Sequence, residues 1–308
     1  MVNSTQVLYF TLTAYFDAGL FKYLLFIIIM SLYISIICAN VFLIVIICMN
    51  RSLHEPMYIF LCSLFANELQ GSSGFFPFFL SQIISDIHTI SLPFCFLQIF
   101  CLFSYINVQL CNLTLMSYDR YLAICYPLQY NSLMTFKKVA VLIALTWIYP
   151  YFEVAVMMYF SARLKLCGNI INKVYCDNYS IVKLSCTDSS ANNINGIVYL
   201  LFVVSGVVSL IFYTYAKILK VCFSGSKHTR QKAISTCTPH LASLLNFSFG
   251  CLFELIQSRF NMSGVPNFLR IFLSLYFLTC QPLFNPVLYG LKMSKINSLC
   301  KSLLFVKM

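Results

Sequence analysis

Long uncharged runs dominate this 308-residue chain and constrain its fold more than any other feature. Between Asp86 and Asp119 lie 32 residues without Asp, Glu, Lys or Arg, and 28 such residues separate Lys22 from Arg51. An α-helix needs about 20 mostly apolar residues to cross the hydrocarbon core of a bilayer. Each of these two runs is therefore long enough to span a membrane as a helix.

The overall composition supports the same interpretation. The chain is 60% hydrophobic and 9% charged, whereas soluble domains carry about 25% charged residues. This excludes a water-soluble globule and leaves no room for a separate soluble domain. The runs predict an all-α membrane protein, a single seven-transmembrane helix bundle over residues 1–308, with spans at about 23–49, 57–80, 93–121, 139–160, 192–219, 235–258 and 268–291.

The basic residues predict the orientation of the bundle. With the amino terminus outside, thirteen of the 20 Lys and Arg residues face the cytoplasm and seven face outward. Cytoplasmic loops are enriched in Lys and Arg, so we expect a multi-pass plasma-membrane protein with an extracellular amino terminus and a cytoplasmic carboxyl terminus. The net charge of +11 then suits anionic membrane lipid as a partner rather than nucleic acid.

Both ends of the chain carry smaller signals. Asn3 begins an Asn-x-Ser/Thr sequence in the amino-terminal segment and is the best candidate for glycosylation among several such sequences. From Lys292 onward, bases alternate with apolar residues, which predicts a short amphipathic helix over about 292–304 on the inner leaflet.

Four of the 15 cysteines fall on the predicted outer face, where disulfides form: Cys95, Cys167, Cys176 and Cys186. Four cysteines allow three pairings. Their spacing in the sequence does not choose among the three.

The most informative stretch is Met116–Tyr130, M-S-Y-D-R-Y-L-A-I-C-Y-P-L-Q-Y, where Asp119 and Arg120 end an apolar run. Charges at that depth are costly, so they are usually paired and tend to mark function; the alternative is a helix end with interfacial charges. The string resembles the end of the third transmembrane helix of rhodopsin-like G-protein-coupled receptors. Its second half resembles the olfactory receptors.

Three further blocks resemble olfactory receptors, in the order that family has them: Leu53–Leu61 (L-H-E-P-M-Y-I-F-L), Lys232–Leu241 (K-A-I-S-T-C-T-P-H-L) and Pro282–Tyr289 (P-L-F-N-P-V-L-Y). The resemblance implies an odorant receptor that binds a small odorant in its extracellular half. It would activate a heterotrimeric G protein of the olfactory stimulatory type and raise cyclic AMP. The alternative is a rhodopsin-like receptor for a non-olfactory small ligand.

Two other classes are less well supported. A transporter or channel predicts internal repeats or paired broken helices, and the sequence has none that we detect. An enzyme is not expected, because no nucleophile–base pair stands out and the four His residues show no metal-ligand spacing. No metal site is expected either.

The resemblance also implies roles for individual residues. It joins Cys95 to Cys176 and Cys167 to Cys186. It assigns G-protein coupling and an activation switch to Asp119, Arg120, Tyr121, Tyr215, Asn285, Pro286 and Tyr289.

Glu68 lies near mid-membrane, where an ionisable residue is a functional hypothesis by default. The resemblance implies a cation or water site shared with Asn40, Gln109 and Asn285, which could hold a sodium ion; no other cofactor is expected. The alternative is a protonated Glu68 that is hydrogen-bonded inside the bundle.

The odorant pocket is expected in the outer half, among the third, fifth and sixth spans. Any one apolar side chain there is more often a packing residue than a ligand contact. Glu254 is the acid of the outer sixth span and could anchor a polar or cationic odorant, and Phe249 stands where relatives carry a Trp or Tyr. The other candidates, taken by helical spacing, are Leu102, Phe103, Ile106, Asn107, Val198, Tyr199, Phe202 and Val203.

Overall fold

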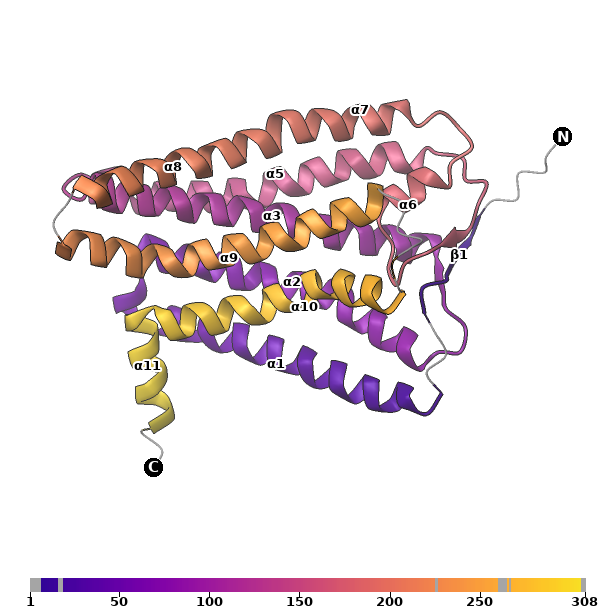
Figure 1. Ribbon diagram of the computed structural model, residues 1–308, viewed down its shortest axis with the longest axis horizontal. Helices are drawn as coiled ribbons and strands as arrows, with labels where there is room; N and C mark the ends of the chain where they lie inside the picture. Colours follow the sequence, from indigo (N-terminus) through magenta and orange to yellow (C-terminus); the bar gives the residue numbers. More distant parts are fainter. Residues whose placement is uncertain (1–6, 16–18, 225–226, 260–264, 266, 306–308) are drawn as a thin grey trace.

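The structure is a computed structural model that describes residues 7–15, 19–224, 227–259, 265 and 267–305. Within these residues, seven helices of 20 to 34 residues run alongside one another (Figure 1). They are α1 (Phe21–Met49), α2 (Pro56–Ile84), α3 (Leu92–Cys125), α5 (Phe136–Ala162), α8 (Ser205–Ser224), α9 (Lys227–Arg259) and α10 (Asn267–Lys292). Helix α3 contacts α2, α5, α8 and α9, so it forms the centre of the bundle.

Shorter helices complete the chain. Helix α7 (Ser190–Val198) and the π-helical segment η2 (Tyr199–Val204) lead directly into α8. The remaining short helices are η1 (Arg51–Leu53), α4 (Tyr130–Leu133), α6 (Asn178–Lys183) and α11 (Ser294–Phe305). Helix α11 turns away from α10 at the end of the bundle opposite β1 (Figure 1).

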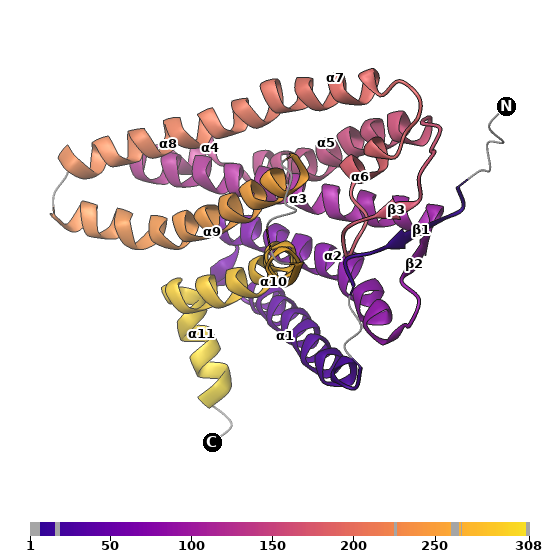
Figure 2. The same ribbon diagram turned by 45° about the vertical axis from the view of Figure 1, so that its right-hand side comes forward.

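A small sheet covers one end of the bundle, and the sequence pattern does not predict it. Strand β1 (Tyr9–Leu12) lies between β2 (Thr89–Ser91) and β3 (Ile170–Ile171), as Figure 2 shows. It pairs antiparallel with β2 and parallel with β3. We call this end of the bundle the sheet end and the opposite end, where α3 finishes, the Arg120 end.

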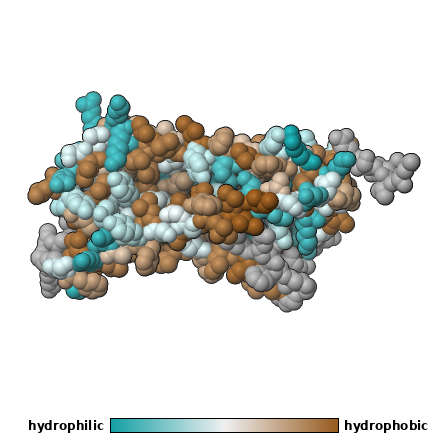
Figure 3. Space-filling view, turned by 90° about the horizontal axis from the view of Figure 1, so that it is seen from above, coloured by the Kyte–Doolittle hydropathy of each residue, from teal (hydrophilic) through white to brown (hydrophobic). Residues whose placement is uncertain are grey.

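Buried polar residues and exposed large apolar residues distinguish this bundle from a soluble protein. Asn40, Glu68 and Asn285 are completely buried, whereas Ile148 and Phe212 are exposed. In the space-filling view, hydrophobic residues predominate in the middle of the face shown and hydrophilic residues gather toward its two ends (Figure 3). An apolar belt around a polar interior is the arrangement that a hydrocarbon solvent favours.

Among the described residues, four helices are long and apolar enough to cross a membrane by length and composition: Phe21–Met49, Leu92–Cys125, Phe136–Ala162 and the continuous Ser190–Ser224. Helices α2, α9 and α10 are also long enough, with 29, 33 and 26 residues. These three helices carry buried polar residues, which include Asn67, Glu68, His240, Ser243 and Asn285. These residues form much of the interior described below.

Candidate functional site

Asp119 and Arg120 form an ion pair in the last turns of α3, at the Arg120 end. The guanidinium donates to Asp119 Oδ2 from both Nη2 and Nε, the latter at 3.0 Å. Tyr130 of α4 donates its hydroxyl to Asp119 Oδ1 at 2.6 Å. Burial, followed by the nearby Asp119 carboxylate, raises the pKa of Tyr130. Both oxygens of Asp119 are therefore occupied, and Arg120 is held by its neighbour in sequence.

A buried histidine connects three helices one level further into the bundle. His240 of α9 bonds through Nδ1 to the hydroxyl of Tyr215 in α8. Its Nε2 lies 2.9 Å from the carbonyl oxygen of Leu113 in α3. In the tautomer that carries the proton on Nε2, this nitrogen donates to that oxygen. This contact fixes the spacing of α3, α8 and α9 next to Arg120.

The remaining switch candidates lie in different environments. Asn285 of α10 donates to Glu68, whereas Tyr289, one turn on, is completely buried beside the ring of Phe65 at 6.4 Å between centroids. Pro286 is buried within α10. Tyr121 faces another direction, with its hydroxyl 3.4 Å from that of Tyr126. The structure therefore does not bring the switch candidates into one cluster.

Glu68 is the centre of the largest polar cluster in the described part of the bundle, and it is 0% exposed. Its Oε1 accepts from Gln109 Nε2 at 2.8 Å and from Asn285 Nδ2 at 2.5 Å. Its Oε2 accepts from the hydroxyl of Tyr105 at 2.8 Å. Asn67 of α2 buttresses the cluster by donating to Gln109 Oε1 at 3.0 Å. Three helices thus converge on one carboxyl group.

Asn40 was expected to share the site at Glu68, but it makes other hydrogen bonds. It donates to the carbonyl oxygens of Ile36 and Pro282, each at 2.9 Å, and so ties α1 to the proline of α10. Among the described residues there is no group of three or more His, Cys, Asp or Glu that could hold a metal. A sodium ion at Glu68 stays a prediction. Such an ion would compete with the three donors already bound to the carboxyl group.

A chain of hydrogen bonds extends from Glu68 toward the sheet end along the seam between α9 and α10. Ser243 donates to Asn285 Oδ1 at 2.7 Å, and Gln281 donates to the carbonyl oxygen of Ser243 at 3.4 Å. Asn246 donates to Gln281 at 2.6 Å and accepts from Tyr276 at 2.5 Å. The polar interior therefore continues from mid-bundle into the half nearer the sheet end.

Two of the expected pocket residues come together in that half, with a third that was not expected. The hydroxyl of Tyr199 in η2 bonds to Asn107 Oδ1 in α3. Asn107 Nδ2 lies 3.5 Å from Glu153 Oε2 in α5. Leu102 and Ile106 belong to one apolar cluster of the bundle and Phe103 to another. We call Asn107, Glu153 and Tyr199 the polar triad.

The expectation for Phe202 was wrong. Its side chain is 75% exposed on the outside of the bundle, while Val203 is half-buried and Val198 is exposed. The segment Tyr199–Val204 is a π-helix, which has more residues per turn than an α-helix. The third residue after Tyr199 is therefore rotated off the face that Tyr199 presents to α3.

The environment of Phe249 also differs from the expectation. Phe249 is 53% exposed and lies edge-on to Tyr276, with 5.5 Å between ring centroids. The buried ring at this level of α9 is Phe247, 5.8 Å from Phe277 of α10. Phe247 and Phe249 are two residues apart, and two residues rotate an α-helix by about 200°. The two rings therefore lie on nearly opposite faces of α9.

Glu254 is occupied by a partner from the loop before α6. Lys173 Nζ lies 3.3 Å from Glu254 Oε2 and 3.5 Å from Asp177 Oδ2. Burial alone would lower the pKa of Lys173, but the two carboxylates outweigh it and raise this pKa. The carboxylate expected to anchor an odorant is therefore already neutralised by the chain itself.

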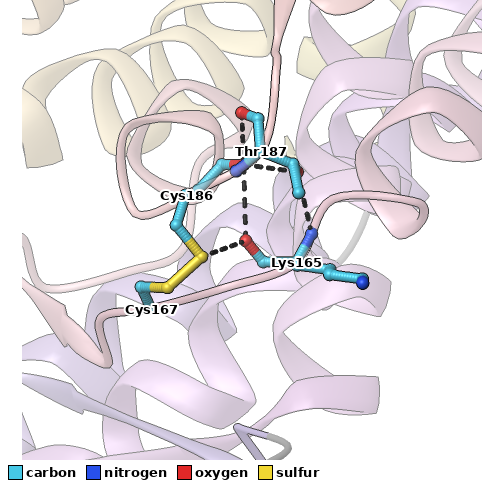
Figure 4. Close-up of a disulfide and its surroundings, with 5 residues drawn as sticks. Lys165, Cys167, Cys186 and Thr187 are labelled. Carbon is cyan, nitrogen blue, oxygen red and sulfur yellow. Dashed lines mark hydrogen bonds between the residues drawn. A yellow bond between two sulfur atoms is a disulfide. The ribbon is translucent and has the colours of Figure 1, made fainter. Parts of the chain in front are cut away.

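Two disulfides hold the loop between α5 and α7 over the sheet end. The structure joins Cys95 to Cys176 and Cys167 to Cys186, the pairing that the resemblance implied. Gln98 of α3 accepts from Cys176 N at 2.8 Å. Around the second bridge, Cys186 N donates to Lys165 O at 3.0 Å and Lys165 N to Thr187 Oγ1 at 3.1 Å (Figure 4).

Comparisons with known proteins agree on what the chain resembles. It is 32% identical to human olfactory receptor 11A1 over 302 residues, covering 97% of this chain and 94% of that receptor. It is 32% identical to mouse olfactory receptor 6E1 over 299 residues, covering 96% and 95%. Squid rhodopsin has the same fold, with a TM-score of 0.73 at 17% identity over 94% of this chain and 82% of that one.

The family profile described as olfactory receptor matches residues 29–307. The chain belongs to the olfactory receptor family. It is therefore an odorant receptor of the G-protein-coupled class, a multi-pass plasma-membrane protein with a small-molecule ligand and a G-protein partner, and it is not an enzyme.

Several residues that contact the site candidates of this olfactory receptor were not predicted from the sequence. Tyr105 lies four residues before Gln109, hence on the same face of α3, and that spacing could have identified it. Glu153 is an acid within a span, and the rule that singled out Glu68 applies to it equally. Lys173 had no such signal, because its partner lies 81 residues away in sequence. Asn3 lies outside the described residues.

Proposed function

We propose that odorants bind to this receptor in the sheet-end half of the bundle, beside the polar triad of Asn107, Glu153 and Tyr199. The observation that carries the proposal is that α3, α5 and η2 direct polar groups to one point, while the nearby α3 residues Leu102, Phe103 and Ile106 belong to apolar clusters. Small-molecule sites have mostly apolar walls with a few convergent polar groups. The triad therefore supplies orientation, and the surrounding apolar side chains supply most of the contact area.

Glu153 determines which odorants are favoured. Among the described residues, the hydrogen bond to its carboxyl group is the 3.5 Å contact from Asn107, so the group retains capacity to accept. A hydrogen bond to a charged partner is about twice as strong as a neutral one. Odorants with an N–H or O–H donor, and protonated amines above all, are expected to bind here in preference to ethers or hydrocarbons.

The sheet end is assigned to the extracellular side, with the amino terminus outside and the carboxyl terminus in the cytoplasm. Two disulfides at that end support this assignment, since disulfides persist in oxidising compartments. Lys137, Lys138, Lys217 and Lys220 belong to the segments at the Arg120 end, which supports a cytoplasmic location. Helix α11 would then lie on the inner leaflet.

Arg120 is assigned to G-protein coupling. Asp119 and Tyr130 hold it in place in this structure, and the His240 bridge keeps α3, α8 and α9 together beside it. An odorant that displaces η2 at Tyr199 would change the spacing at Tyr215 of α8, since both residues lie on the continuous helix Ser190–Ser224. This change would free Arg120 from Asp119, and Arg120 would then form part of a surface for a stimulatory G protein that raises cyclic AMP. The mechanism has two states, and the ligand biases the equilibrium between them.

The test is a set of amine, alcohol and hydrocarbon odorants applied to cells expressing the receptor, with cyclic AMP as the readout. Glu153→Gln should weaken the potency of amines about tenfold, or 1.4 kcal/mol, and leave hydrocarbons unchanged. Glu254→Gln is the matched control, because the same substitution is made at an acid already paired with Lys173. Equal shifts for amines and hydrocarbons would overturn the proposed site.

The orientation has an independent test at Asn3. We expect the receptor to carry a glycan there, and Asn3→Gln should abolish the mobility shift on glycosidase treatment. An epitope tag ahead of Asn3 should be stained on intact cells. Staining that requires permeabilised cells would overturn the orientation.

A further inference from the structure

A cavity of about 680 Å³ lies at the sheet end, among α1, α2, α10 and the segment after β1. It is bounded by Leu25 and Ile29 of α1, Phe79 and Ile83 of α2, and Leu275 of α10. This volume is within the range of small-molecule sites, about 300–1,000 Å³. None of its lining residues belongs to the polar triad, which lies among α3, α5 and η2.

One end of this cavity is polar and carries two unpartnered atoms. Gln82 is 7% exposed, and its Nε2 donates to Thr89 O at 3.3 Å, but its Oε1 has no partner within the described residues. His88 also lines the cavity, and its buried Nδ1 likewise has no partner in the described part of the chain. A buried acceptor left without a donor costs about 1–3 kcal/mol.

The surroundings of the two atoms are held rigidly. The ring of His88 stacks on that of Tyr15 at 4.5 Å between centroids, and Tyr15 donates its hydroxyl to Val174 O at 2.8 Å. Lys22 and Asp86 pair at 2.7 Å at the rim. The charges of the rim are thus matched to each other, and the cavity presents an uncharged polar end to a ligand.

We infer that this cavity is a second ligand site, which takes a small neutral alcohol with an aliphatic body. The hydroxyl would donate its proton to Gln82 Oε1, and its oxygen would accept from His88 in the tautomer that carries a proton on Nδ1. The aliphatic chain would fill the apolar space between Phe79 and Leu275. A carboxylic acid would place a negative charge against the Gln82 carbonyl oxygen. A hydrocarbon would leave the same oxygen unsatisfied.

The test uses the intact receptor in lipid nanodiscs and a decanol that carries a diazirine. Light should attach the probe to peptides of the cavity wall, within residues 22–29, 79–88 or 271–275. Unlabelled decanol should compete for this labelling. Decane and decyl methyl ether, which have no hydrogen-bond donor, should compete at least about fivefold more weakly. These measurements on the unaltered receptor do not depend on any variant folding.

Two variants sharpen the result. Gln82→Leu should weaken competition by decanol about fivefold or more, and Leu275→Trp should abolish saturable labelling by filling the space. Gln70→Leu is the matched control, since Gln70 is in the same helix, also carries an unpartnered Oε1 and lies outside the cavity. Saturable labelling confined to other peptides, equal competition by decane, or equal effects of Gln82→Leu and Gln70→Leu would overturn the proposal.

Discussion

At the scale of single residues, the three acids inside the bundle differ in how many hydrogen-bond or ion-pair partners they already have. Glu68 accepts three hydrogen bonds. Glu254 pairs with the Lys173 ammonium through Oε2, although its Oε1 has no hydrogen-bond partner within the described residues. Glu153 accepts one hydrogen bond of 3.5 Å and has no cationic partner within the described residues. A carboxyl group that is saturated or paired with a cation favours structure, and one without such partners favours ligand recognition. This distinction moves the expected odorant anchor from Glu254 to Glu153.

The Lys173–Glu254 pair is expected to brace the loop over the sheet end. Both side chains are largely buried. Removing Lys173 leaves Glu254 uncompensated, whereas removing the charge of Glu254 leaves Lys173 paired with Asp177 at 3.5 Å. Lys173→Met should therefore destabilise the purified receptor by about 2 kcal/mol and Glu254→Gln by less, and the double variant should lose little more than Lys173→Met alone. Thermal unfolding in detergent measures this; additive losses would contradict a direct pair.

Asp86→Asn is the comparison for that experiment. Asp86 pairs with Lys22 at the same end of the bundle, but its side chain is almost fully exposed. Exposed pairs contribute little to stability, so this variant should unfold at nearly the same temperature as the unaltered receptor.

At the scale of elements, the contact of α2 with α3 depends on small residues. A Cβ at Gly71 would lie 2.4 Å from the ring of Tyr105, the residue that donates to Glu68. Small residues let transmembrane helices approach closely. The approach of these two helices and the Glu68 cluster are therefore coupled.

Gly71→Ala should reduce the amount of receptor that reaches the cell surface, because Tyr105 must move and Glu68 then loses a donor. Gly206→Ala is the control, since a Cβ there meets nothing within 4 Å. Surface staining of both variants against total receptor gives the measurement. Equal surface levels for both variants would show that the close approach is not required.

The two disulfides should differ in their contribution to stability. Cys95 and Cys176 are 81 residues apart in sequence, and Cys167 and Cys186 are 19 apart. In the chain-entropy account, closing these loops stabilises by about 4.5 and about 3 kcal/mol. Cys95→Ser should therefore lower surface expression more than Cys167→Ser. A Cys95→Ser receptor with unchanged surface level and odorant potency would contradict this.

At the scale of the whole molecule, the sequence predicted the bundle because a membrane makes charged residues costly along whole runs. It could not predict contacts that depend on helix rotation. Tyr199 lies beside Asn107 while Phe202 faces outward, since the π-helical segment alters the rotation between them. The small sheet was missed because its strands have 4, 3 and 2 residues, too few to show a period.

The polar interior connects the proposed odorant site to the proposed coupling site. Tyr199 and Tyr215 lie on the continuous helix Ser190–Ser224, and His240 links Tyr215 to α3 above Arg120. The central claim is that an odorant bound at one end changes the environment of Arg120 at the other. Its direct test compares two arginines at the Arg120 end.

The measurement is odorant-evoked cyclic AMP in cells expressing the unaltered receptor, Arg120→Ala or Arg51→Ala at matched surface levels. Arg51 is an exposed residue of η1, so its replacement controls for the loss of a positive charge. At least one odorant should raise cyclic AMP through the unaltered receptor and through Arg51→Ala, and Arg120→Ala should abolish that response. An undiminished response in Arg120→Ala would contradict the account.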